Sequence, residues 1–222
     1  MKKYKDRNLI EEGYVDTSLI SPYCVVQVVK LLDKMREYSL ETYYHLVDVA
    51  NLTKLVFEHV DLGLTETEKE EVYTAGLLHD VGKLSVPLEL LHTKCDEQGK
   101  EFIQHRHIEA TRAILEEMIG DENIINIAYH HHERMDGTGY PEGINRDKLS
   151  IQDRLVQVAD VASAIMMPRS YRERYVGRED AARILRNNAA AGRLDGYIVE
   201  MMISALNVYN PTDEFVNDEF LK

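Results

Sequence analysis

The segment His131–Pro141 reads HHERMDGTGYP, and it says more about this protein than any other stretch of its 222 residues. It begins with two adjacent imidazoles and ends in Gly137-Thr138-Gly139-Tyr140-Pro141. Histidine is the commonest metal ligand among side chains, whereas glycine and proline at this density predict an irregular loop. The segment therefore indicates metal chemistry at the start of a constrained loop.

A second pair of adjacent candidate ligands lies upstream, in His79-Asp80-Val81-Gly82-Lys83. The side chains of neighbouring residues in a helix point about 100° apart. Such a pair can therefore bind at one site only if the bound group lies between the two side chains. Two metal ions would meet this condition, because an aspartate can bridge two metals while each neutral imidazole offers one nitrogen. Asp80 is the expected bridge, and His131 and His132 repeat the arrangement.

Four more residues are candidate ligands. Glu41 and His45 are four residues apart, the spacing at which two side chains share one helix face. His107 and Asp160 lie on two further predicted helices and add an imidazole and a carboxylate. The remaining histidines are expected at the surface or behind the ligands: His59, His92, His105 and His130.

Composition narrows the class of protein. The net charge is -13, from 26 basic and 39 acidic side chains, which argues against a broad basic face for DNA. A small phosphorylated ligand would need its charge met locally, by metal ions and a few Lys or Arg side chains. No apolar run approaches the ~20 residues of a membrane span, and no secretion signal is evident. A cytoplasmic protein without membrane contact is expected, and Cys24 and Cys95 are expected to be inert thiols.

Helical periodicity dominates the chain, so we expect an all-α fold, a single globular helical bundle. Thr65 and Glu68 have the spacing of a capping box, which starts a helix near Glu66 that should end at Gly82. Asp121 and Ser150 are expected N-caps. The other predicted helices are Tyr23–Met35, a helix containing Glu41 and His45, Gln98–Met118, Asp121 to about His132, Ser150 to about Met167, Glu179–Asn188 and Asp195–Leu206. Residues 1–40 are expected to form an N-terminal helical extension and residues 41–222 the functional domain.

The two motifs together resemble the signature of the HD-GYP family, a branch of the HD-domain phosphohydrolases. The resemblance covers roughly Glu41 to Leu206. It implies an all-helical domain with two or three divalent metal ions, usually iron or manganese, that hydrolyses cyclic di-GMP to linear pGpG or GMP by attack of a metal-bridging hydroxide. The ligands it implies are Glu41, His45, His79, Asp80, His107, His131, His132 and Asp160. Glu41 would accompany the three-metal form of the site.

The catalytic residues expected on this reading are Asp80, which holds the metals together, and Lys83, which neutralises charge on the phosphate. In this chain, Arg169-Ser170-Tyr171-Arg172 resembles the segment that follows the last metal-binding helix in the family. Arg169 and Arg172 would therefore contact phosphate or guanine, a role suited to forked cationic donors. Tyr140 offers a ring that stacks on a base or packs under its loop.

Departures from the family pattern keep other functions open. Ser163 stands where relatives usually carry a second aspartate, and Ser170 replaces a proline. These changes leave the predicted ligands in place but bear on substrate affinity and rate. The alternatives are a non-catalytic cyclic-dinucleotide receptor and a phosphohydrolase of another nucleotide. A diguanylate cyclase (GGDEF) domain and a second copy of the chain are the candidate protein partners.

Overall fold

The structure is a computed structural model that describes residues 15–91, 96–166 and 176–208. Within these ranges it is all-helical, as predicted, and it contains no strand. The helices are α1 (Val25–Tyr38), α2 (Leu40–His59), α3 (Glu66–Leu78), α4 (Leu88–Leu91), α5 (Glu97–Met118), α6 (Glu122–Tyr129), α7 (Ile151–Met166), α8 (Arg178–Ala190) and α9 (Gly196–Val208), with 3₁₀ turns η2 (Thr17–Leu19) and η3 (Val81–Ser85). None of the helices in these ranges is long and apolar enough to cross a membrane.

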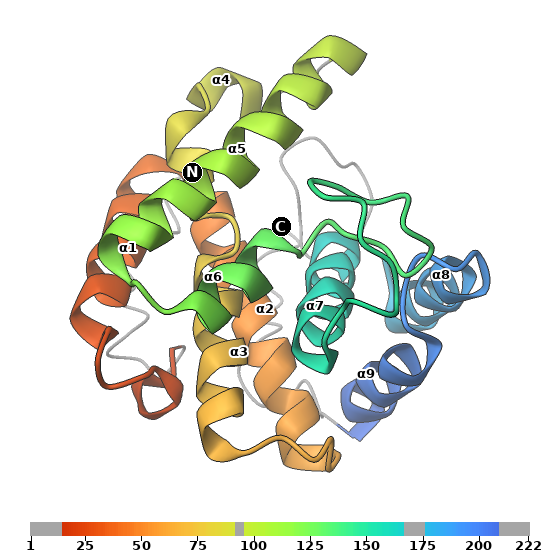
Figure 1. Cartoon of the computed structure of the whole chain (residues 1–222). Coiled ribbons are helices and arrows are strands. Elements are labelled where there is room, and N and C mark those ends of the chain that lie inside the picture. Colours follow the sequence, from red (N-terminus) through yellow and green to blue (C-terminus); the bar gives the residue numbers. More distant parts are fainter. Residues whose placement is uncertain (1–14, 92–95, 167–175, 209–222) are drawn as a thin grey trace, which may run out of the picture.

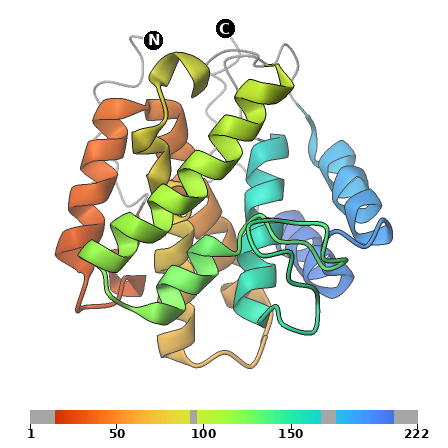
Figure 2. The ribbon, with the colours of Figure 1, turned by 45° about the horizontal axis from the view of Figure 1, so that its top comes forward.

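Helices α2 and α3 form the centre of the bundle. Helix α1 covers one side of them, while α7, α8 and α9 lie on the other side (Figure 1). Helix α5 runs diagonally across the front of the bundle (Figure 2), and it packs closely on η3 and α6. One hydrophobic core runs through these helices and includes Leu32, Leu46, Leu77, Val158 and Met202.

Capping residues start the helices where the sequence predicts. The Thr65 hydroxyl accepts a hydrogen bond from the Glu68 N–H (3.2 Å), and the Glu68 carboxylate accepts one from the Thr65 N–H (2.8 Å), which is a complete capping box. Asp121 caps α6 by accepting from two backbone N–H groups. Each cap satisfies helix-terminal donors that would otherwise lack partners.

The two helices that lead into the histidine motifs, α3 and α6, end earlier than predicted. Helix α3 ends at Leu78 instead of Gly82, so His79 is its C-cap and Asp80 lies outside it. The expectation that Gly82 terminates the helix was wrong. A Cβ at Gly82 would lie 1.9 Å from the carbonyl oxygen of His107, so glycine is required there by the close approach of α5.

Helix α6 likewise ends early, at Tyr129, and His130 is its C-cap. His131 and His132 therefore lie in the turn after the helix, where the Glu133 N–H donates to the His130 carbonyl (2.9 Å). A turn frees adjacent side chains from the 100° separation of a helix. The two imidazoles consequently stand close together, with ring centroids 4.0 Å apart.

Helix α1 is an integral part of the packing. Its residues Val28, Leu31, Leu32 and Met35 are buried and belong to the same core as α2 and α3. The division of the chain at residue 40 into an extension and a domain stays a prediction.

Candidate metal centre

Seven of the predicted ligands converge at the centre of the bundle. They are contributed by α2, the end of α3, α5, the turn after α6, and α7: His45, His79, Asp80, His107, His131, His132 and Asp160. All are buried except His132, whose side chain is 29% exposed. The cluster is therefore closed on most sides and opens beside His132.

Asp80 lies between two sets of imidazoles. Its Oδ1 is 3.4 Å from Nε2 of His107 and 3.7 Å from Nε2 of His131. Its Oδ2 is 3.5 Å from Nε2 of His79 and 3.7 Å from Nε2 of His45. One carboxylate thus presents one oxygen to each set, which is the arrangement that a bridge between two metal ions requires.

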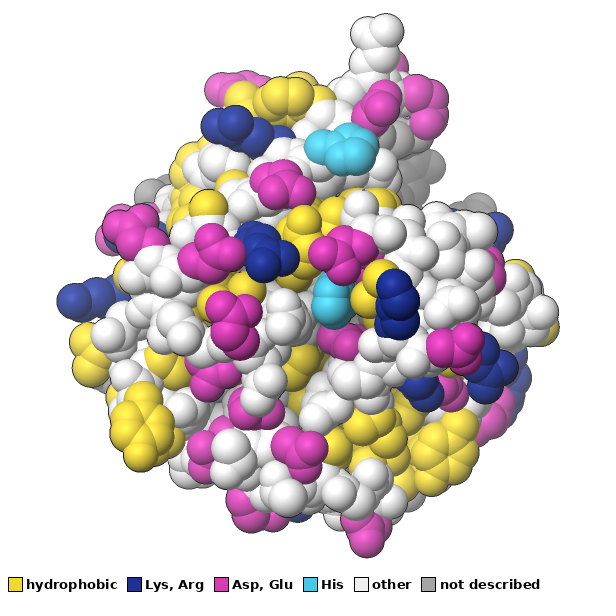
Figure 3. All heavy atoms as spheres, viewed as in Figure 1, with side chains coloured by type: hydrophobic (Ala, Val, Ile, Leu, Met, Phe, Trp, Pro, Cys, Tyr) yellow, Lys and Arg dark blue, Asp and Glu magenta, His cyan; other side chains and the backbone are white. Residues whose placement is uncertain are grey.

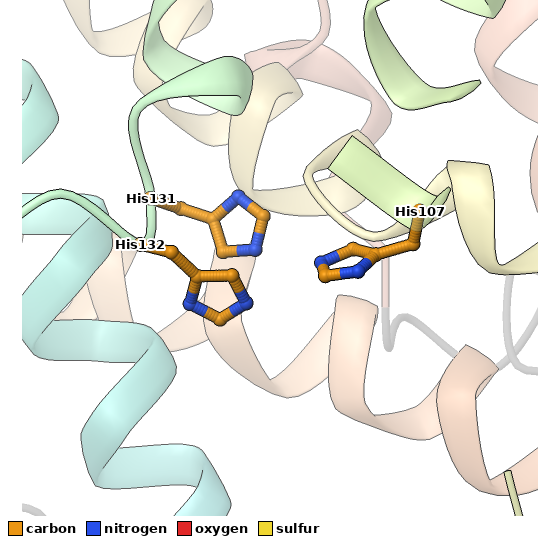
Figure 4. Close-up of side chains that lie close together, drawn as sticks. All are labelled: His107, His131 and His132. Atoms are coloured by element: carbon orange, nitrogen blue, oxygen red, sulfur yellow. The ribbon is translucent and has the colours of Figure 1, made fainter. Parts of the chain in front are cut away.

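Two of the possible metal-binding groups have no residue in common. His107, His131 and His132 form one, and their rings point toward one another from α5 and the turn after α6 (Figure 4). His45, His79 and Asp160 form the other, and His79, Asp80 and His131 form a group between them. Within each group the ligand atoms lie within 4.8 Å of one another.

Hydrogen bonds at Nδ1 aim three of the rings into the cluster. Nδ1 of His79 lies 2.8 Å from the Gly76 carbonyl, Nδ1 of His107 lies 2.6 Å from that of Ile103, and Nδ1 of His131 lies 2.7 Å from that of Ala128. Because a carbonyl only accepts, each Nδ1 carries a hydrogen and each neutral ring leaves Nε2 as an unprotonated ligand atom.

The donor set fits divalent metal ions. Nε2 of His79, His107 and His131 and Oδ1 of Asp80 are buried without a hydrogen-bond partner. Buried polar atoms are normally satisfied, so four unsatisfied atoms directed at one another indicate a ligand that all of them share. Imidazole nitrogen and carboxylate oxygen together suit iron, manganese and similar ions.

Electrostatics favours an ionised Asp80 and neutral rings at His107 and His131. Burial alone would raise the pKa of Asp80, but Lys83 and His79 outweigh it and hold that pKa well below its usual value. Burial lowers the pKa of His131 well below 6.5, and it also lowers that of His107. At neutral pH the carboxylate is therefore ionised and these imidazoles are neutral.

Lys83 approaches the cluster from η3. Its ammonium contacts Oδ2 of Asp80, and its side chain is 19% exposed. A cation at this place offsets part of the negative charge of the buried carboxylate. The role of Lys83 toward a substrate phosphate stays a prediction.

The loop after the histidine pair folds back on that pair. The buried Glu133 carboxylate accepts hydrogen bonds from the N–H groups of Glu142 (2.6 Å) and Gly143 (3.0 Å). A Cβ at Gly139 would lie 2.4 Å from Cα of Glu133, so glycine is needed there. Tyr140 consequently lies against His132, with ring centroids 4.8 Å apart.

Some predicted site residues are not placed at the cluster. Glu41 lies in the first turn of α2, is half-buried, and is not a member of the groups described above. Arg169 and Arg172 lie outside the described residues, as do His92 and Cys95. The ligand role of Glu41 and the substrate contacts of the two arginines stay predictions.

Three other histidines lie apart from these groups. His59 and His105 are exposed, and His130 lies between Asp153 (3.3 Å) and Glu142 (3.6 Å). These positions agree with the expectation that they lie at the surface or behind the ligands.

Three supporting residues were not recognised as such from the sequence. Glu133 anchors the loop, and its place directly after the histidine pair was the available signal. Thr111 accepts from the Gly82 N–H (2.9 Å) and donates to the His79 carbonyl (3.1 Å), which joins α5 to the first motif. Ser163 lies 2.8 Å from Nδ1 of His45. Nothing in the sequence pattern marked these last two contacts.

The surface is mixed in charge on the face drawn in Figure 3. Lys and Arg side chains there are interspersed with Asp and Glu, and a histidine is visible near the middle of the face. Lys and Arg side chains therefore form no continuous basic tract on the face that this view draws.

Known proteins resemble this chain in sequence. A family model described as HD domain matches residues 39–198. The 3'3'-cGAMP-specific phosphodiesterase 1 of Vibrio cholerae is 33% identical over 164 residues, which are 73% of this chain and 37% of that protein. A cyclic di-GMP phosphodiesterase of Pseudomonas aeruginosa is 30% identical over 81% of this chain and 43% of its own length. The chain thus spans less than half of these relatives.

Solved structures agree on the fold. The HD domain of the phosphodiesterase PgpH from L. monocytogenes, in complex with cyclic-di-AMP, matches with a TM-score of 0.61 and 17% identity, covering 85% of this chain and 99% of that one. The protein Bd1817 of Bdellovibrio bacteriovorus matches with a TM-score of 0.61 and 22% identity, covering 73% and 51%. This chain belongs to the HD domain family and, within it, to the HD-GYP type of phosphohydrolases.

Proposed function

We propose that this protein is a metal-dependent phosphodiesterase that hydrolyses cyclic di-GMP to linear pGpG, GMP or both. The observation that carries the proposal is Asp80, whose two oxygens face two separate sets of imidazoles. Divalent ions in such a centre supply Lewis-acid stabilisation of phosphoryl oxygens and lower the pKa of bound water. Iron and manganese are the proposed metals, two in number, with a third if Glu41 joins the site.

The side chains around the centre have distinct proposed tasks. Asp80 would bind the metal of each ligand set with one of its two oxygens, and so hold the two metals together. Lys83 places an ammonium beside that carboxylate, where it stabilises the negative charge that develops on a phosphodiester during cleavage. Tyr140 presents its ring at the exposed edge of His132, where a nucleobase of the substrate would stack. Arg169 and Arg172 are proposed to bind phosphate or guanine.

A related nucleotide is the second candidate substrate. The relative from Vibrio cholerae that is 33% identical is specific for 3'3'-cGAMP by its name. The two cyclic dinucleotides share the same phosphodiester ring and differ in one base, so the same centre could cleave either. Base recognition by residues at the rim would then decide between them. Contact with a GGDEF domain, a homodimer and a cytoplasmic location stay predictions.

Substrate turnover tests the proposal. The purified chain is loaded with Fe²⁺ or Mn²⁺ without air and incubated with cyclic di-GMP, 3'3'-cGAMP or cyclic-di-AMP, and the products are separated by chromatography. We expect linear dinucleotide or mononucleotide from cyclic di-GMP, and none after chelation or with His131→Ala. If the fully metallated protein binds these nucleotides but releases no product, the protein is a receptor and the enzymatic proposal is refuted.

A further inference from the structure

His45 is held differently from the other buried histidines of the cluster. The Nδ1 atoms of His79, His107 and His131 face backbone carbonyls, which fix the tautomer that leaves Nε2 free for a metal. Nδ1 of His45 instead faces a side chain, the hydroxyl of Ser163, at 2.8 Å. The two residues are 118 positions apart in the chain, and Ser163 is fully buried on α7.

A hydroxyl differs from a carbonyl because it both donates and accepts a hydrogen bond. With the Ser163 hydroxyl as donor, the neutral His45 ring carries its hydrogen on Nε2, which lies 2.9 Å from Oδ1 of Asp160. With the hydroxyl as acceptor, the hydrogen moves to Nδ1 and Nε2 becomes a ligand atom. The same contact therefore serves His45 both with and without a metal.

We propose that Ser163 is a positioning residue of the metal centre. It holds the His45 ring in place and accepts from Nδ1 when Nε2 binds a metal, and it thereby sets the affinity of the position formed by His45, His79 and Asp160. The position formed by His107, His131 and His132 does not depend on Ser163. The inference rests on the proposed metal centre, and it concerns metal affinity rather than the choice of substrate.

Removal of the hydroxyl separates this role from simple packing. Ser163→Ala removes the hydroxyl that faces Nδ1 of the buried His45. Loss of such a supporting hydrogen bond typically weakens metal binding about 10- to 100-fold. Ser163→Thr keeps a hydroxyl at the same carbon and should retain most of the affinity. Thr74→Val is the matched control, because the Thr74 hydroxyl is also fully buried but has no hydrogen-bond partner.

The experiment measures metal binding without any substrate. Metal-free wild-type chain, Ser163→Ala, Ser163→Thr and Thr74→Val are titrated with Mn²⁺ without air, and bound metal is counted by equilibrium dialysis and elemental analysis. Electron paramagnetic resonance then distinguishes isolated from coupled Mn²⁺ ions. We expect two affinities in wild type, and in Ser163→Ala one of them weakened about 10- to 100-fold, with isolated Mn²⁺ at intermediate loading. Thr74→Val should match wild type.

Three outcomes would overturn the inference. Unchanged Mn²⁺ affinities in Ser163→Ala would show that the hydroxyl has no effect on the centre. Equal weakening of both positions, or the same weakening in Thr74→Val, would show a general packing defect. If wild type binds no Mn²⁺ at all, the proposed metal centre fails and the inference fails with it. Two Mn²⁺ ions without any nucleotide hydrolysis would refute only the proposed function.

Discussion

Gly82→Ala is the most informative single substitution in the fold, because it tests the contact between the first motif and α5. The added Cβ would lie 1.9 Å from the His107 carbonyl oxygen and 2.4 Å from the Thr111 backbone nitrogen. Ordinary contact begins at 3.4 Å, so α5 or η3 must move by about 1.5 Å, the difference between these distances. Both groups are backbone atoms, so a change of side-chain rotamer cannot relieve the overlap.

The magnitude follows from what this movement disrupts. Overpacking of a close-packed interior costs about 1–3 kcal/mol. The two hydrogen bonds of Thr111, from the Gly82 N–H and to the His79 carbonyl, are each worth about 1 kcal/mol. We therefore expect the free energy of unfolding of the metal-free protein to fall by about 3–5 kcal/mol. His107 moves with α5, so metal binding should weaken as well.

Urea unfolding in the presence of a chelator measures the first effect, and elemental analysis of metal-loaded protein measures the second. Gly196→Ala is the matched control, because the same methyl group there would meet only the Ala189 Cβ at 3.9 Å. This control should be as stable as wild type or more stable, since alanine favours helix formation. A Gly82→Ala protein within about 0.5 kcal/mol of wild type, with full metal content, would refute the reasoning.

Three further predictions concern the centre and its loop. Asp80→Asn should reduce metal at both positions while far-UV circular dichroism stays unchanged; full Mn²⁺ stoichiometry would exclude a bridging role. Burial lowers the pKa of His131 and His107, so below pH 6.5 these two residues bind more protons in the unfolded chain than in the folded one. The free energy of unfolding of the metal-free protein should therefore fall by up to about 1.4 kcal/mol per pH unit for each histidine. A urea midpoint that stays constant between pH 6.5 and 5 would contradict this. Glu133→Ala should raise KM and speed proteolysis of the 134–143 loop. Glu133→Gln can still accept hydrogen bonds from both N–H groups and should resemble wild type. If both variants show the same rise in KM and the same faster proteolysis, the carboxylate does not anchor the loop.

Much of the fold could be predicted because its signals are local. Apolar residues at three- and four-residue steps, together with the caps at Thr65 and Asp121, located the helices of the described residues except the short α4. The ends of α3 and α6 could not be predicted in this way. Gly82 resembles a helix terminator in the sequence, but it is required by the approach of α5, a contact between segments distant in the chain.

The candidate site was predicted from adjacency and resemblance, and its geometry came from packing. The pairs at His79-Asp80 and His131-His132 are visible in the sequence, and so is the all-helical HD-GYP type that they indicate. That Asp80 turns one oxygen to each set of imidazoles depends on where α2, α5 and α6 lie relative to α3. Glu133 anchors its loop through backbone groups only nine and ten positions further along the chain.

By itself, the sequence determined the helical class, the family and the residues capable of binding metal, because periodicity, capping and short motifs act over a few neighbouring residues. Only the tertiary structure decided which of these residues meet, which groups face the Nδ1 atoms of their imidazoles, and that the Ser163 hydroxyl lies against His45. Such contacts join side chains far apart in the chain. Their distances are set by the packing of whole helices, which no local pattern encodes.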